Sequence, residues 1–446
     1  MSLPGATAHP GEGELVRELT LLDSTMINIG SMIGSGIFIV PAAIALSLPS
    51  SSMMTAVWIA GGVISLFGAL SVAELGAMMP RAGGMYVYLR EAYSPLWGFL
   101  YGWAAFFLIN TGSIAAVAVT FAAYLGYFFP LGSIEVKIVA VASVVLLTVA
   151  NCFGIKAGAI IQNGFTIVKI AALALLGVLC FALSGGSVNN LSPVLPQMGV
   201  SGMLGPLGLA LVAVLWSYDG WIEITYVAGE VKDPQRVLPR ALLLSTAAVI
   251  VLYALVNLGY LFVLSPGGMA RSSLVASDAA VAVLGPAGAA AIAVVVIVST
   301  FGTNNGFIIA APRIQYAMAK EGLFFGWFAR IHPRFHTPIP ALLVQGALGA
   351  VLIVSGTFEQ LTTYVVFASF LFYAMSAGAV MILRRRSPGA LRPYRTWGYP
   401  ATPVIFIGFS AFLVVAAVIE NPAGSAIGAG IIALGIPAYF IWRKHA

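Results

Sequence analysis

Long apolar stretches separated by short polar segments run through almost the whole of this sequence. Each stretch is long enough to cross about 30 Å of hydrocarbon as an α-helix. The pattern therefore predicts an all-α polytopic membrane protein with about twelve transmembrane helices. The predicted spans lie near residues 23–47, 53–79, 97–127, 136–153, 160–184, 206–230, 238–264, 287–319, 338–356, 359–384, 403–420 and 424–442.

Two of these spans are interrupted near the middle, where a membrane helix should be most regular. The first contains Gly30, Gly34 and Gly36, and the sixth contains the polar sequence Ser217–Gly220. Glycine costs about 1 kcal/mol relative to alanine inside a helix, so these positions favour an opened backbone. Unpaired backbone groups are costly in hydrocarbon and persist only beside a polar cavity. One break alone is explained by a structural kink, whereas two at matching places indicate a secondary transporter.

The matching breaks predict two repeats of five spans each. Residues 23–184 form the first repeat and residues 206–384 the second, and each begins with its broken helix. Because five is an odd number, the second repeat enters the membrane from the opposite side, and the two breaks face each other near the midplane. Residues 1–22 are expected to form a cytoplasmic lead, and residues 403–442 two further helices outside the repeats.

The composition agrees with a membrane protein, since 60% of the residues are hydrophobic and only 8% are charged. The net charge of +6 does not indicate nucleic-acid binding, because the basic residues gather in the C-terminal tail and in the loops after even-numbered spans. By the positive-inside rule, both termini are expected in the cytoplasm. The expected location, which the family resemblance described below implies, is the plasma (inner) membrane. Glu12, Glu14 and Glu18 interrupt any apolar core near the N-terminus, which argues against a cleavable signal peptide.

One basic residue, Lys169, is predicted near the midplane of the fifth span. A lysine there costs at least about 2.5–3.5 kcal/mol on insertion scales, so it should face the protein interior. Its ammonium group would replace a bound cation by donating to opened carbonyls of the first span and to Ser299 and Thr303 of the eighth. A proton site created by burial and a structural tether between helices are the alternatives. Asn305 is a supporting polar residue of the eighth span.

The two breaks together predict a binding site for a zwitterion. Backbone amides at the start of the half-helix after the first break suit a carboxylate, because they lie at its positive end. Opened carbonyls near both breaks suit an ammonium group. An α-amino acid is therefore the predicted substrate class. The predicted substrate-binding residues are Met32, Ile33, Gly34, Ser35, Gly36, Ile37, Trp216, Ser217 and Asp219.

The acidic residues around the second break leave two interpretations open. Asp219 and Glu223, four residues apart, would share one face of a helix and attract a cationic substrate or a proton. Alternatively, Asp219 caps the half-helix that begins there, and Glu223 is a packed or gate residue. Trp216 and Tyr218 are the predicted gate residues, with Trp216 directly at the break. Glu74, near the cytoplasmic end of the second span, is expected to be a buried ion-pair partner.

No residues suited to a metal site or a cofactor stand out. All four histidines lie in the termini or in a cytoplasmic loop, so no histidine metal site is predicted within the membrane. A membrane enzyme is therefore not expected. An ion channel is a further alternative, although two discrete half-helix sites favour occlusion of a substrate over a continuous polar pore.

Seven segments carry a resemblance to a known family: Gly34–Phe38, Pro80–Tyr88, Phe165–Lys169, Trp216–Trp221, Glu230–Pro239, Ser299–Gly306, and Arg392–Arg395 together with Gly398–Pro400. In these segments the chain resembles bacterial members of the L-type amino acid transporter family, within the amino acid–polyamine–organocation superfamily. The resemblance implies five-plus-five inverted repeats and exchange of amino acids by alternating access. It also implies that Ser35 and Gly36 bind the substrate carboxylate, that Trp216 is the aromatic gate, and that carbonyls around Met32 and Trp216 bind the amine. Lys169 matches the lysine that stands where sodium-coupled relatives bind a cation.

The chain departs from the animal members of that family in two places. Many of them carry Asn directly after the tryptophan of the sixth span, whereas Ile222 follows Trp221 here, which affects recognition of the substrate side chain. They also join a glycoprotein subunit through a cysteine between the third and fourth spans. Residues 128–135 contain no cysteine, so no disulfide-linked heavy subunit is expected.

The leading prediction is thus an exchanger of L-amino acids, with neutral substrates ahead of cationic ones. A proton-coupled amino acid symporter is the close alternative, because Lys169 fits either mechanism. A cationic amino acid transporter that uses Asp219 is the other alternative, since the resemblance places this residue in the lining of the pocket. The expected partners are the amino acid and membrane lipid, with no cofactor and no nucleic acid.

Overall fold

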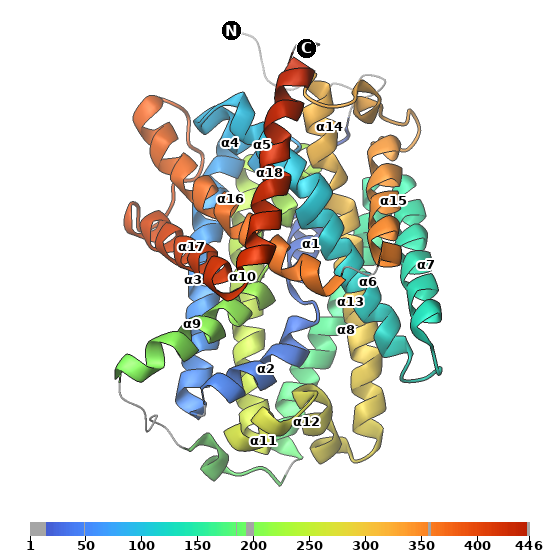
Figure 1. The fold of residues 1–446 in the computed structure, drawn as a ribbon, viewed down its shortest axis with the longest axis vertical. Coiled ribbons are helices and arrows are strands. Elements are labelled where there is room, and N and C mark those ends of the chain that lie inside the picture. Colours follow the sequence, from blue (N-terminus) through green and yellow to red (C-terminus); the bar gives the residue numbers. More distant parts are fainter. Residues whose placement is uncertain (1–14, 49, 184, 193–199, 356–357, 444–446) are drawn as a thin grey trace.

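The computed structural model describes residues 15–48, 50–183, 185–192, 200–355 and 358–443. Within these residues the protein is built from helices, and the only strand-like pairing is an isolated bridge between Leu19 and Val231. Figure 1 shows a bundle whose helices run mainly along its long axis. The greater part of the predicted N-terminal lead, residues 1–14, lies outside the described residues.

Each predicted span corresponds to one helix or to consecutive helices. These are α1 Leu21–Met32 with α2 Gly36–Ser47, α3 Ser51–Met78, α5 Pro95–Ala104 and α6 Asn110–Leu125 joined by the π-helical turn Ala105–Ile109, α7 Ser133–Cys152, α8 Ile155–Ala182, α9 Val200–Ser217, α10 Pro234–Val263, α13 Ala287–Ala310 with α14 Pro312–Lys320, α15 Ile339–Ser355, α16 Phe358–Arg386, α17 Ala401–Glu420 and α18 Pro422–Arg443.

The lengths of these helices support a membrane protein. Among the described residues, nine helices are long and apolar enough to cross a membrane, and the bent pair of α1 and α2 is a tenth candidate. Two shorter apolar helices, Gly205–Ser217 within α9 and α15, occupy the positions of the sixth and ninth predicted spans. The prediction of an all-α polytopic membrane protein is confirmed.

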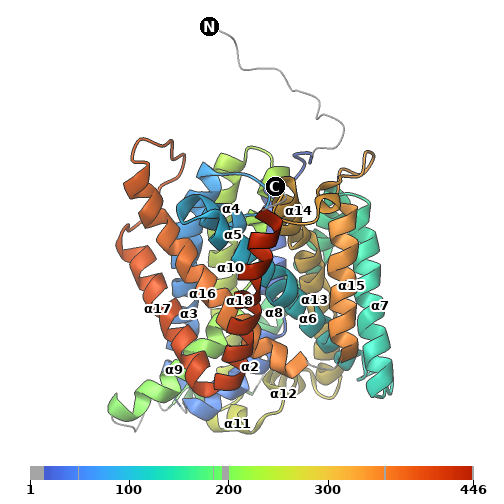
Figure 2. The ribbon, with the colours of Figure 1, turned by 45° about the horizontal axis from the view of Figure 1, so that its top comes forward.

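Three short helices are absent from the sequence-based prediction: α4 Met85–Ala92, α11 Pro266–Arg271 and α12 Val275–Leu284. The helix α4 follows a turn at Gly83 and Gly84, whose φ angles are positive. The helices α11 and α12 both pack against α2, at the lower end of the bundle in Figure 2. They are too short to span a membrane, so a search for long apolar stretches passes over them.

The two broken spans lie at the centre of the bundle. The helix α1 packs against α8, α10 and α13, and α2 packs against α9 (Figure 1). The helices α7 and α15 pack together on one side, whereas α16 and α17 pack together on the other. This arrangement surrounds the opened backbone of the breaks with protein, as opened backbone in a membrane requires.

The break in the first span is confirmed. The helix α1 ends at Met32 and α2 begins at Gly36, with a bend of 42° between them. Gly30 cannot carry a side chain without displacing Gln162 and Thr166 of α8, which an added Cβ would overlap. The glycines of this segment therefore allow close packing as well as an opened backbone.

The second break, in the sixth span, is longer than the sequence suggests. Residues 218–230 form turns and two short 3-10 helices, Glu223–Thr225 and Ala228–Glu230, before α10 begins. Asp219 and Glu223 therefore do not share one face of an α-helix, and that expectation is wrong. The physical reason is Gly220, whose φ of 99° ends the helical path.

Side-chain and backbone hydrogen bonds anchor the C-terminal end of the segment of residues 218–230. Glu230 accepts from Arg313 of α14 in a bidentate ion pair of 2.8 and 3.1 Å, and both side chains are almost fully buried. The backbone amide of Leu19 donates to the carbonyl of Glu230, and that of Lys232 donates to the carbonyl of Leu19. The segment before α1 and the segment before α10 are thus held side by side.

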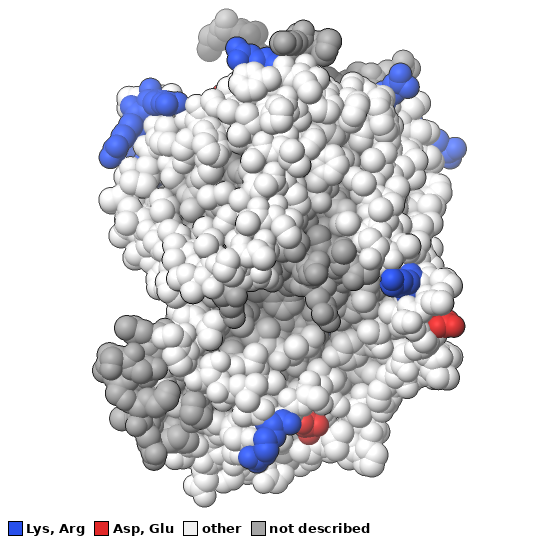
Figure 3. All heavy atoms as spheres, in the orientation of Figure 1, with Lys and Arg blue, Asp and Glu red and all other residues white. Residues whose placement is uncertain are grey.

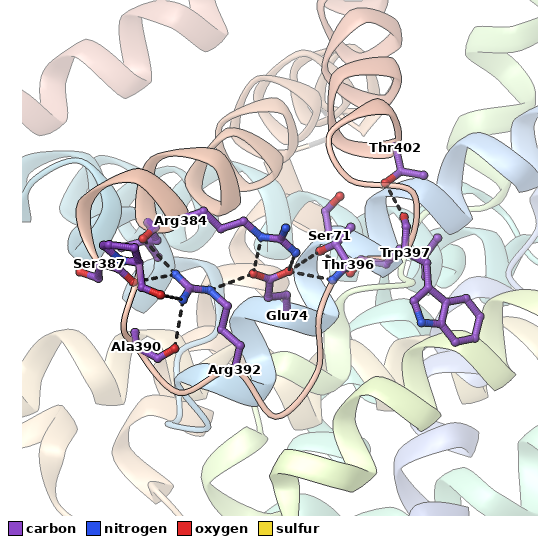
Figure 4. A network of polar contacts seen from close by, with 12 residues as sticks. Ser71, Glu74, Arg384, Ser387, Ala390, Arg392, Thr396, Trp397 and Thr402 are labelled. Atoms are coloured by element: carbon purple, nitrogen blue, oxygen red, sulfur yellow. Dashed lines mark hydrogen bonds and ion pairs between the residues drawn. The ribbon is translucent and has the colours of Figure 1, made fainter.

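A second network joins the connector after α16 to the second span (Figure 4). Glu74 of α3 accepts from Arg384 at 2.9 and 2.6 Å, and from the backbone amide of Thr396 at 2.8 Å. Arg392 lies 3.2 Å from the same carboxylate. The prediction that Glu74 is a buried ion-pair partner is confirmed.

The molecular surface agrees with a position in the membrane. Figure 3 shows a face that is mostly uncharged, with Lys and Arg mainly towards its upper edge. Many large apolar side chains of the outer helices are exposed, such as Leu146 of α7, Val251 of α10 and Ile419 of α17. Such surface would face water only at a high cost, but it is suited to lipid.

We predict that Gly220→Ala destabilises the protein by more than about 2 kcal/mol, because L side chains rarely adopt a φ of this kind. In addition, a Cβ at this position would lie 2.8 Å from the backbone of Ser31. The measurement is thermal unfolding of the purified protein in detergent. Gly164→Ala is the matched control, since a Cβ there meets nothing within 4 Å. Equal stability of the two variants would contradict the prediction.

Candidate functional site

A pocket with about 580 Å³ of empty space, its mouth included, lies between the two broken spans. It is lined from the breaks by Ser31, Met32, Gly34, Ser35, Gly36, Trp216, Ser217 and Asp219, and from other helices by Gly112, Ser113, Ala116, Val117, Thr303, Phe307 and Val365. Seven of the nine predicted substrate-binding residues are therefore in its wall. Ile33 and Ile37 are fully buried and are not among its lining residues.

One side of the pocket presents the start of α2. Among the described residues, no side chain caps this helix. The backbone amides of Ser35, Gly36 and Ile37 also donate to no backbone carbonyl among these residues. The first amides of a helix have no partner within the helix and lie at its positive end. Gly36 is close to α9, since an added Cβ would lie 2.6 Å from Ser217 Oγ. This corner of the pocket is suited to an anionic group such as a carboxylate.

Carbonyl groups of both breaks lie near the same corner. The hydroxyl of Tyr253, from α10, lies 3.1 Å from Met32 O and 3.2 Å from Ser217 O, and so connects the two breaks. Trp216 O accepts from the amide of Asp219. Met32 O also accepts from the amide of Gly34, so both of its lone pairs are used. Ser217 O and Trp216 O each accept from one donor named here, and a carbonyl oxygen with two lone pairs then retains capacity for a further donor such as an ammonium group.

Lys169 lies beside the first break rather than in the wall of the pocket. Its side chain is fully buried, and Nζ lies 2.6 Å from Gly30 O and 2.8 Å from Ile33 O. The same nitrogen lies 3.1 Å from Ser299 O and 3.1 Å from Thr303 Oγ1. An ammonium group has three protons, so these four oxygens fully occupy it. Lys169 thus joins α8, α13 and the opened end of α1.

Hydroxyl groups of α13 are also hydrogen-bonded to the opened carbonyls of the first break. Ser299 Oγ donates to Ile33 O at 2.8 Å, and Thr303 Oγ1 lies 3.0 Å from Gly30 O. Asn305 lies two residues after Thr303 in α13, and its amide nitrogen donates to Gln162 Oε1 and to a backbone carbonyl of α8. Asn305 is therefore a packing contact between helices, away from the pocket.

The structure gives no support to the interpretation of Asp219 as a helix cap. The residue that precedes the next 3-10 helix is Ile222, so Asp219 does not cap it. Instead, Asp219 Oδ1 accepts from the hydroxyl of Tyr373 of α16 at 2.6 Å. Asp219 therefore lines the pocket with a carboxylate that is already bound to a hydroxyl.

The two predicted gate residues have different positions. Trp216 is half-buried and lines the pocket. Tyr218 is fully buried and packs against Trp58 and Tyr253, with ring centroids 6.1 and 5.0 Å away. Trp216 therefore remains a candidate gate, whereas Tyr218 lies among the packing residues behind the break.

Comparison with known proteins identifies the family. A family model described as amino acid permease matches residues 19–442. The chain belongs to the amino acid permease family. This permease is 33% identical over 440 residues to the serine/threonine exchanger SteT of Bacillus subtilis (strain 168). The aligned region covers 98% of this chain and 99% of that relative. The permease is 32% identical over 435 residues to the b(0,+)-type amino acid transporter 1 of Mus musculus, with coverage of 96% and 88%. It is 33% identical over 439 residues to the Asc-type amino acid transporter 1 of Mus musculus, with coverage of 96% and 82%.

Several residues of the permease's site escape sequence reasoning. Tyr253 and Tyr373 are aromatic residues in apolar spans, where nothing in the local pattern separates a hydrogen-bonding tyrosine from a packed one. The contribution of α6 has a weak signal, a run of small residues that includes Gly112, Ser113 and Ala116. In the parts of the chain that the structure describes, no three His, Cys, Asp or Glu side chains lie together as a metal site would require.

We predict that Lys169→Met slows amino acid transport by at least about tenfold, because it leaves two carbonyls of the first break and two oxygens of α13 without their charged donor. Transport by purified protein in proteoliposomes is the readout, and thermal unfolding of the same preparation reports on the fold. Lys320→Ala is the matched control, since that side chain is exposed at the end of α14. Wild-type transport by a well-folded Lys169→Met protein would refute the role of this lysine.

Proposed function

We propose that this permease exchanges neutral L-amino acids across the plasma (inner) membrane by alternating access. The observation that carries the proposal is a pocket with free helix amides on one side and backbone carbonyls of both breaks beside them. These two groups complement the carboxylate and the ammonium of one α-amino acid. Ser35 and Gly36 would bind the carboxylate, and the carbonyls of Met32 and Trp216 the amine.

The remaining wall of the pocket supports a neutral side chain. Gly112, Ser113 and Ala116 of α6 are small, and Val117 and Phe307 are apolar. Asp219 offers the only carboxylate among the described lining residues, and Tyr373 already donates to it. The relative from Bacillus subtilis is by its name a serine/threonine exchanger, which agrees with a small neutral substrate.

Alternating access would follow from the proposed repeats, residues 23–184 and 206–384, whose broken helices meet at the pocket. The basic loops support an orientation with both termini in the cytoplasm. Lys169 would hold the first break open in place of a metal cation. Residues 128–135 contain no cysteine, which supports transport by this chain without a disulfide-linked subunit.

A counterflow experiment in proteoliposomes distinguishes an exchanger from a transporter that carries out net uptake. We predict that external labelled serine or threonine enters at least about tenfold faster when the vesicles contain unlabelled substrate, because return of the empty carrier is slow in an exchanger. A proton gradient imposed on vesicles without internal amino acid should then produce little uptake. Uptake that follows the pH gradient and ignores internal amino acid would establish the proton-coupled symporter instead.

The cationic alternative depends on Asp219, so its test is ligand binding to the wild type and to Asp219→Asn. We predict that neutral amino acids raise the unfolding temperature of both proteins, whereas lysine and arginine raise that of neither. A ligand at 100 times its Kd stabilises the folded state by about 2.7 kcal/mol, which thermal unfolding detects. Stabilisation of the wild type by lysine or arginine, lost in Asp219→Asn, would establish the cationic transporter.

A further inference from the structure

Glu223 is a buried carboxyl group to which the proposed binding of amino acids assigns no role. Its side chain is only 4% exposed, and it lies in the 3-10 helix after the second break, outside the wall of the pocket. Its Oε2 atom is buried and has no hydrogen-bond partner in the described structure. A buried polar atom without a partner is uncommon in folded proteins and calls for a physical explanation.

The groups whose charges interact with that of Glu223 are acidic or hydroxyl groups. Its own segment provides Asp219 and Tyr226, α5 provides Tyr101, and α16 provides Tyr373. Their own contacts hold these groups in place. The hydroxyls of Tyr101 and Tyr226 are hydrogen-bonded to each other at 2.7 Å, and Tyr373 donates to Asp219. The 3-10 helix of Glu223 itself packs against α1, α10 and α13. The charged residues of these helices are committed or distant from the interior, since Asp23 of α1 is paired with Lys156, and Arg236 and Arg240 of α10 are exposed.

The two fully buried cations of the described structure are committed elsewhere. Lys169 contacts four oxygens around the first break. Arg313 donates to Glu230 through Nε and Nη2, and to Ile309 O through Nη1. An ionised Glu223 would therefore be a buried carboxylate near a second carboxyl group and without a counter-ion. Such a charge costs several kcal/mol, and the group avoids that cost by binding a proton.

We propose that Glu223 is a proton-binding site, protonated when the protein is closed around it as in this structure. The ligand is a single proton from bulk water, which neutralises the carboxylate and returns to water when the group becomes hydrated. The inference deepens the proposed function and rests on it, because hydration of Glu223 requires the conformational change of alternating access.

The closed arrangement identifies the contacts that must separate. The segment of Glu223 is held to α5 by the hydroxyl pair of Tyr101 and Tyr226, and to α16 by Tyr373 and Asp219. Asn28 of α1 fixes it from a third side, by contacts to the backbone of Trp221 and Ile224. Movement of this segment away from α5 and α16 would admit water to the carboxyl group. Binding and release of the proton are then linked to closing and opening of the protein.

The test is the pH dependence of counterflow in proteoliposomes with the same pH on both sides. We expect the wild-type rate to vary at least about threefold between about pH 5 and pH 9, as a titrating group requires. Glu223→Gln, which resembles the protonated acid, should remain active and lose that dependence. Glu223→Asp should retain it, and Asp278→Asn is a matched control, because Asp278 is an exposed carboxylate of α12.

Each outcome bears on the proposal. The same pH profile in the wild type and in Glu223→Gln, or a flat wild-type profile, would overturn the proton site and leave amino acid exchange intact. An absence of counterflow at every pH would overturn the exchanger itself. If Glu223→Gln does not fold, calorimetry of serine binding to the wild type in two buffers of different ionisation enthalpy gives the number of protons exchanged. A value of zero across this pH range would overturn the proposal.

Discussion

The opened backbone of the first span is the constraint on which the rest of the structure depends. Carbonyls without partners in a membrane cost several kcal/mol each, and so does a buried ammonium group without acceptors. The contact of Lys169 with Gly30 O and Ile33 O removes both costs at once. Since the lysine is part of the chain, its ammonium group is a permanent donor to these carbonyls. The free amides at the start of α2 exist only because α1 ends at this place.

The second break is stabilised in a different way, by its neighbours. The side chain of Asn28 of α1 is hydrogen-bonded to backbone groups of Trp221 and Ile224 in this segment. The hydroxyl of Tyr253 of α10 lies within hydrogen-bond distance of a carbonyl from each break. At Gly220 the two opened chains come so close that no side chain fits between them. The breaks therefore form one unit of directly contacting groups. Coupling of this kind, through a contiguous set of packed groups, is what alternating access requires.

The sequence predicted features whose physical cost is visible locally, and missed those that depend on distant partners. A lysine in an apolar stretch and glycines in the middle of a span are expensive wherever they occur, so Lys169 and the first break could be recognised. Tyr253 contacts Met32 across 221 positions of the chain, and no local pattern reports such a contact. The error at Asp219 and Glu223 came from extending helical periodicity through Gly220, whose backbone conformation only the structure reveals.

The two acids of the second break differ in their surroundings, and the difference connects substrate binding with protons. Asp219 borders the pocket and has a hydroxyl donor, whereas Glu223 is buried behind it with an unpaired oxygen. The ammonium group of a bound amino acid would add a positive charge beside Asp219, and so change the field that both carboxyl groups experience. If substrate alters the binding of a proton at Glu223, then the proton alters the binding of substrate by the same factor. A permease with this arrangement is sensitive to pH through its own carboxyl group, even when its net reaction exchanges one neutral amino acid for another.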